Sequence, residues 1–69
     1  MARRMNWLCR EIAGIAETAE NFVTVLDAET KRKVRLPRSE IDFGPRRVFV
    51  SEWCWKTIYR PTIEKERMA

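Results

Sequence analysis

Apolar residues in the first third of the chain recur at helical spacing. Between residues 6 and 22 they fall three or four positions apart, at Leu8, Ile12, Ile15, Ala19 and Phe22. This spacing places them on one side of an amphipathic helix. Asn6 is a suitable N-cap, whereas Gly14 lies in the middle of the pattern and disfavours a helix by about 1 kcal/mol relative to alanine. The pattern predicts a helix over 6–20, and a strand over 8–16 is the alternative.

A β-hairpin is predicted over residues 22–37. The segment 22–26, Phe-Val-Thr-Val-Leu, is rich in β-branched and apolar residues, and 27–31 form a polar turn. The segment 32–36 then returns as the second strand and stops at Pro37. Because side chains alternate along a strand, Val34 and Leu36 are expected in the core, and Lys31, Lys33 and Arg35 on the opposite face.

The chain after this hairpin contains a predicted loop and a third strand. The segment between Pro37 and Pro45 carries Ile41 and Phe43, which are expected to tuck under the sheet, and Gly44-Pro45 ends it. Residues 47–51, Arg-Val-Phe-Val-Ser, predict a strand.

Two structures remain open for residues 52–60. Ser51 is a good N-cap and Glu52 an acidic first-turn residue, which favours a short helix. Bulky side chains at odd positions, including Trp53, Trp55 and Tyr59, instead suit a strand over 53–59 with one aromatic face. Residues 61–69 are charged, contain Pro61 and are expected to fray.

These elements predict a single α+β domain over residues 1–69. In it, an N-terminal amphipathic helix packs on a three-stranded antiparallel sheet, and a short C-terminal aromatic helix closes the core. The alternative is an all-β, SH3-like small barrel in which 8–16 and 53–59 are strands. A chain of 69 residues buries a small core, so self-association or a larger partner is one way to complete it.

The positive charge is concentrated in one window. Lysine and arginine total 14 against 10 acidic residues, a net charge of +4. Residues 31–47 contain seven of the basic residues and two of the acidic ones, a local charge of +5, which leaves −1 for the remainder. The window therefore predicts a basic surface.

The composition argues against catalysis and metal binding. The chain has no histidine, so neither cysteine has the usual activating base, and two cysteines are too few for a four-ligand zinc site. We therefore expect a protein that is not an enzyme and has no cofactor and no metal. No apolar stretch is long enough to cross a membrane, and the N-terminus lacks a signal peptide's apolar region. Two cysteines without such a signal suggest the cytoplasm.

A short motif resembles one found in small phage and prophage proteins. Leu36, Pro37, Arg38, Ser39 and Ile41 match a hairpin that ends in Leu-Pro-[Lys/Arg]-Ser-x-Ile, and Trp53 matches the tryptophan-bearing element that follows a strand in those proteins. The resemblance covers about residues 22–55, and these proteins usually have proline where this chain has Ser51. It implies a mobile-element origin and a small β-rich fold, and it implies no activity.

Two binding functions follow from these features. A basic strand face can bind nucleic acid through its phosphates, and nearby aromatic rings can stack on bases. The alternative is a protein–protein inhibitor or accessory factor that docks on a larger host or phage enzyme, like an anti-CRISPR protein, through an exposed tryptophan. The candidate binding residues are Lys31, Lys33, Arg35, Arg38, Arg46, Arg47, Trp53 and Trp55.

Overall fold

Within residues 7–64, which the computed structural model describes, five antiparallel strands form one sheet. They are β1 (Trp7–Thr18), β2 (Phe22–Asp27), β3 (Lys33–Pro37), β4 (Ile41–Gly44) and β5 (Arg47–Ser51). A 3₁₀ turn, η1 (Arg38–Glu40), joins β3 to β4. The order across the sheet is β3-β2-β1-β5-β4, so β1 lies at its centre.

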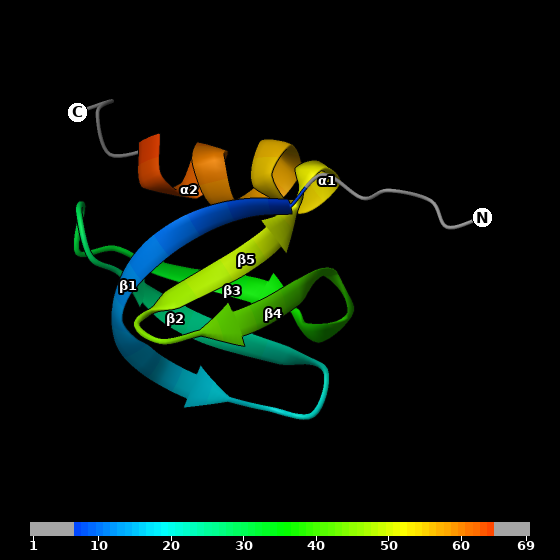
Figure 1. Ribbon diagram of the computed structural model, residues 1–69, viewed down its shortest axis with the longest axis horizontal. Coiled ribbons are helices and arrows are strands. Elements are labelled where there is room, and N and C mark those ends of the chain that lie inside the picture. The colour runs from blue at the N-terminus through cyan, green and yellow to red at the C-terminus, as the bar shows by residue number, and fades with distance from the viewer. Residues whose placement is uncertain (1–6, 65–69) are drawn as a thin grey trace.

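The long central strand β1 divides the sheet into two halves. Its residues 7–11 pair with β5, and residues 12–18 pair with β2. Register shifts between Ile12 and Gly14 and between Ile15 and Glu17 interrupt the second half. Such irregularities increase the twist and bend of a strand, and Figure 1 shows β1 curling around the molecule. The sheet is therefore rolled, and β2 and β3 lie behind β4 and β5.

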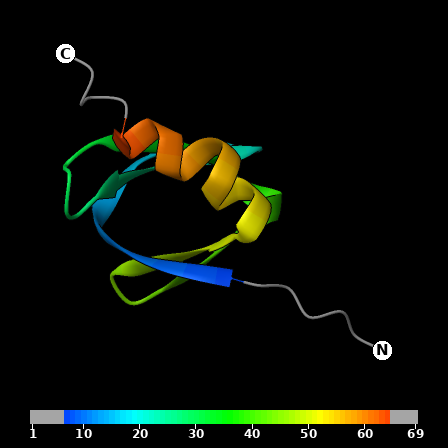
Figure 2. The ribbon, with the colours of Figure 1, turned by 90° about the horizontal axis from the view of Figure 1, so that it is seen from above.

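One continuous helical segment follows β5 and lies across one end of the rolled sheet (Figure 2). It consists of α1 (Glu52–Cys54), the π-helical turn η2 (Trp55–Tyr59) and α2 (Arg60–Glu64). The Ser51 hydroxyl accepts a hydrogen bond from the Cys54 N–H at 3.1 Å and so caps the first turn. Pro61 has no N–H to donate one turn back, and the widened π turn ends at Tyr59, two residues before it.

The core is built from alternate strand residues and the inner side of the helix. Its buried apolar side chains are Ile12, Val23, Val25, Val34, Leu36, Val48, Val50, Cys54 and Tyr59. Most of them are valines, which suit a tightly curved sheet because their branched side chains pack well on a pleated surface.

The predicted N-terminal helix and three-stranded sheet are wrong. Residues 7–18 form β1, in which Ile12 is the one buried side chain, and the sheet has five strands within the described residues. The helical spacing of apolar residues gave the wrong element because one of them, Ile15, is 52% exposed and does not belong to the core. The register shifts in β1 also interrupt the alternation of buried and exposed side chains that marks a strand. The alternative, a small all-β fold with a strand over 8–16, fits better, although its strand over 53–59 is helical instead.

Several local predictions are confirmed. β2 and β3 form the expected hairpin with Val34 and Leu36 buried, and β5 occupies 47–51 as predicted. The helix begins after Ser51 and continues to Glu64, past the predicted end at 60, and residues 65–69 of the expected frayed tail lie outside the described residues.

The predicted loop between Pro37 and Pro45 is wrong, because it contains η1 and β4. Ile41 packs against the core as expected, whereas Phe43 is 39% exposed.

Candidate functional site

The structure divides the predicted basic face into several parts. Lys33 and Arg35 are exposed on β3, opposite the buried Val34 and Leu36. Lys31 precedes the strand, has a φ of 64°, and donates from Nζ to the Ala28 carbonyl at 3.0 Å. The regular three-residue row predicted from strand alternation is therefore reduced to two residues.

Two arginines near β3 make contacts within the chain. The Arg35 guanidinium lies 4.2 Å from the centre of the Phe22 ring. Arg38 is in η1, and its Nε donates to the Ala19 carbonyl at 2.8 Å. The Arg38 bond uses one of the N–H donors that phosphate binding would require, whereas stacking leaves the in-plane N–H groups of Arg35 available.

The remaining basic candidates lie in the other half of the sheet. Arg46 is in the turn between β4 and β5 and has a φ of 58°, and Arg47 begins β5 opposite Glu11. The strands β2 and β1 lie between β3 and β5, so these arginines form a separate group from Lys33 and Arg35.

The tryptophans fall into two environments. Trp55 is half-buried and stacks on Tyr59 with ring centres 5.3 Å apart. Trp53 is 55% exposed and Trp7 is 42% exposed. Trp7 pairs with Ser51 across β1 and β5, and Trp53 is two residues further along the chain. We call Trp7 and Trp53 the exposed tryptophan pair. Sequence analysis listed Trp53 but missed Trp7 as a site residue.

A buried charged cluster, which sequence analysis also missed, joins the sheet to the helix. Asp27 is fully buried and receives hydrogen bonds from Arg10 Nε to Oδ1 at 2.7 Å and from Arg10 Nη2 to Oδ2 at 3.2 Å. The Tyr59 hydroxyl donates to Oδ1 at 2.6 Å, and the N–H and hydroxyl of Thr30 donate to Oδ2 at 2.9 Å each. Arg10 Nη2 also contacts Glu29 Oε1 at 2.9 Å. We call these residues the Asp27 cluster.

The environment shifts the pKa values of this cluster. Burial alone would raise the pKa of Asp27, but the hydrogen bonds from Arg10, Tyr59 and Thr30 hold it well below its usual range. The hydrogen bond that Arg10 donates to Asp27 raises the pKa of Arg10, and burial raises the pKa of Tyr59. Asp27 therefore stays ionised and acts as an anchor for the helix.

The two edge strands of the sheet, β3 and β4, have features that disfavour pairing with a further strand. β3 contacts η2, and its exposed side chains Lys33 and Arg35 are charged. In β4 the Ile41 N–H donates to the Arg38 carbonyl, and the Phe43 N–H donates to Asp42 Oδ1 at 2.9 Å. The outward donors of β4 are thus already used.

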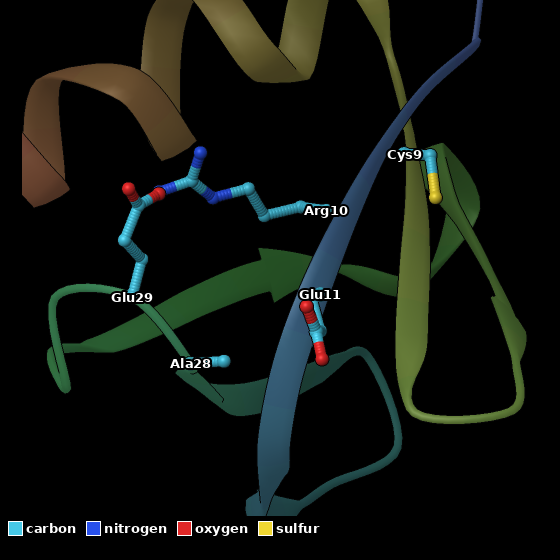
Figure 3. A pocket seen from close by; sticks show the side chains of 5 residues that line it. All are labelled: Cys9, Arg10, Glu11, Ala28 and Glu29. Atoms are coloured by element: carbon cyan, nitrogen blue, oxygen red, sulfur yellow. The ribbon is translucent and has the colours of Figure 1, made fainter.

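Two hollows flank β1 near its middle. One, of about 590 Å³, is lined by Cys9, Arg10, Glu11, Ala28 and Glu29 (Figure 3). The other, of about 600 Å³, is lined by Cys9, Glu11, Pro45, Arg46 and Arg47. Sequence analysis identified Arg46 and Arg47, but the remaining lining residues depend on strand pairing.

Among residues 7–64, no group of three potential metal ligands gathers, and no helix is long and apolar enough to cross a membrane.

Comparison of the chain with protein-family models, with curated proteins and with solved structures gives no match.

Proposed function

We propose that the protein is a binding module that docks on a larger partner protein through the exposed tryptophan pair. The observation that carries this proposal is the exposure of Trp53 and Trp7, at 55% and 42%, near the junction of β5 and the helix. Tryptophan is enriched among the residues that dominate binding energy in protein interfaces, because its large ring buries much apolar area with few rotatable bonds.

The distribution of charge favours this role over nucleic-acid binding. Lys33 and Arg35 are separated from Arg46 and Arg47 by two strands. A nucleic-acid surface gains affinity from several cations along one backbone path and from rings beside them. Trp53, in contrast, follows β5 at the Ser51 end, whereas Arg47 begins that strand.

The proposed partner is an enzyme of a host cell or a phage, and the module acts on it in the cytoplasm without catalysis of its own. The resemblance of residues 22–55 to small phage proteins supports this choice of partner. In this proposal the Asp27 cluster is structural, since it fixes the helix that carries Trp53.

The test compares three tagged forms of the protein in capture experiments followed by mass spectrometry and reconstitution with the purified partner. Trp53→Ser should lose the partner, and Lys33→Glu combined with Arg35→Glu should retain it. Equal thermal melting of all forms controls for folding. Retention by Trp53→Ser with loss in the double charge variant, or recovery of nucleic acid alone, would contradict the proposal.

A further inference from the structure

The central strand β1 has one main-chain edge without a partner strand near Cys9. Ile12 donates its N–H to the Arg46 carbonyl at 3.0 Å, so the main-chain groups of Ile12 face β5. Main-chain groups two residues apart on a strand face the same way, so those of Arg10 also face β5. The Glu11 carbonyl faces the other way and accepts from the Ala28 N–H at 3.2 Å. Cys9 is two residues from Glu11 and therefore faces the same way. β2 pairs with β1 only from Ile12 onwards, so among the described strands none pairs with this edge at Cys9.

A hollow lies along this unpaired edge. It measures about 590 Å³ and is bounded by Cys9–Glu11 on one side and by Ala28 and Glu29 on the other. The Cys9 side chain points away from this space, on the side of β1 that faces β5 (Figure 3). The main chain of Cys9 therefore borders the hollow. The five residues 7–11 of β1 span about 13 Å at ~3.3 Å per residue, which suits an extended segment of about four residues.

The charges around the hollow favour a basic occupant. Arg10 is already bound by Asp27 at 2.7 Å and by Glu29 at 2.9 Å. Lys31 Nζ bonds the Ala28 carbonyl beside the hollow. The charged residues that line the hollow are Arg10, Glu11 and Glu29, with a net charge of −1, whereas Arg46 and Arg47 line the second hollow, on the β5 side of β1. Glu29 has a 75% exposed side chain and Glu11 is also exposed, so both can meet a ligand.

We propose that the edge of β1 at Cys9–Glu11 binds an extended segment of the partner protein that carries a lysine or arginine. The N–H of Cys9 donates to a carbonyl of the segment, and the carbonyl of Cys9 accepts from one of its N–H groups. The basic side chain of the segment lies against Glu11 or Glu29. Main-chain bonds then supply affinity and the carboxylates supply selectivity. This inference rests on the proposed docking function and specifies how part of the partner is held.

The test uses two capped peptides, Thr-Lys-Val-Lys-Thr and Thr-Glu-Val-Glu-Thr, and amide hydrogen exchange followed by NMR. At millimolar concentration the lysine peptide should slow exchange of the Cys9 amide by about tenfold or more, because the amide becomes hydrogen-bonded. The Arg10 amide, which already pairs with β5, should change little. The glutamate peptide should leave both amides unchanged.

Two pairs of variants test the site independently. Cys9→Pro removes the N–H that the segment needs without removing a bond to β5, and Cys9→Ser keeps it, so the proline variant alone should lose peptide binding. Glu11→Lys should weaken binding of the lysine peptide, and Glu11→Gln should weaken it less. If Cys9→Pro fails to fold, the wild-type exchange and the Glu11 variants decide.

An unchanged Cys9 amide with the lysine peptide, or equal binding of both peptides, overturns the inference. Neither result affects partner capture by the exposed tryptophan pair, which is measured separately with Trp53→Ser. Peptide binding at Cys9 without a Trp53-dependent partner would instead leave this site intact and contradict the proposed function.

Discussion

Replacing Tyr59 by phenylalanine isolates the contribution of one buried hydrogen bond to the Asp27 cluster. The substitution keeps the ring, which is fully buried and stacks on Trp55, and removes only the hydroxyl that donates to Asp27 Oδ1 at 2.6 Å. It therefore separates the electrostatic attachment of the helix from its apolar packing.

The expected loss follows from the geometry. A hydrogen bond to a charged group contributes about 1.5–3 kcal/mol, and complete burial of both partners excludes water as a substitute. Asp27 keeps its bonds from Arg10 and Thr30, so we expect a loss of about 2 kcal/mol rather than the 3–5 kcal/mol that follows removal of one partner of a buried ion pair. For a domain of this size, that loss lowers the Tm by about 8–16 °C.

The same hydrogen bond makes the loss depend on pH. The pKa of Asp27 in the folded protein lies below its ordinary value of about 3.9, so the stabilisation is complete only above about pH 5. As the pH falls through 4, the unfolded chain binds a proton that the folded protein does not, and the free energy of unfolding decreases. The unfolded chain binds this proton equally in wild type and variant, so this decrease is common to both. The difference between wild type and variant should therefore stay constant down to about pH 4 and shrink only at lower pH, where the folded variant begins to bind the proton before the folded wild type does.

Urea unfolding at pH 7 and at about pH 3 measures both quantities. Thr57→Val is the matched control, because the Thr57 hydroxyl bonds the Trp53 carbonyl at 2.7 Å at an exposed position, and its removal should cost less than about 0.5 kcal/mol. A loss below about 0.5 kcal/mol for Tyr59→Phe at pH 7, or a loss that is larger at pH 3 than at pH 7, would refute this account of the cluster.

Three further predictions concern single positions. Arg46→Gly should stabilise the protein by up to about 1 kcal/mol, because φ is 58° at Arg46, whereas Arg47→Gly in β5 should destabilise it in the same thermal melt. Ser51→Ala should cost about 1–3 kcal/mol, because it removes the helix cap and the hydrogen bond that the Ser51 hydroxyl donates to Glu40 Oε1 at 2.5 Å, and a value near zero in urea unfolding would contradict the capping role. Burial raises the pKa of Cys54 to about 11, so at pH 8 a thiol reagent should modify the exposed Cys9 quickly and Cys54 only after unfolding. Fast modification of both thiols in the wild type, or fast modification of the Cys9→Ser variant, would contradict this.

The elements predicted correctly from sequence carry local signals. The segment 22–26 is rich in β-branched residues, the segment 32–36 alternates apolar and charged residues from Lys33 to Leu36, and a short polar turn separates them, so each strand is the nearest partner of the other. Ser51 caps the helix through an N–H three residues later, which is also a local interaction.

The elements predicted wrongly depend on distant partners. β1 is a strand because β5, about forty residues later, and β2 pair with its two halves, and no local pattern contains that information. Arg10 and Asp27 are seventeen residues apart and meet because β1 passes from β5 to β2 at this point. Trp7 lies outside the basic window, and its exposure depends on pairing with Ser51.

The salt dependence of partner affinity tests the central claim most directly. A partner held by Trp7 and Trp53 loses little affinity between low and physiological salt, because apolar contacts are not screened. The account therefore predicts a nearly flat dependence for wild type and loss of binding for Trp53→Ser at every salt concentration. A steep fall in affinity with salt, of the kind that phosphate contacts produce, together with unimpaired binding by Trp53→Ser, would contradict it.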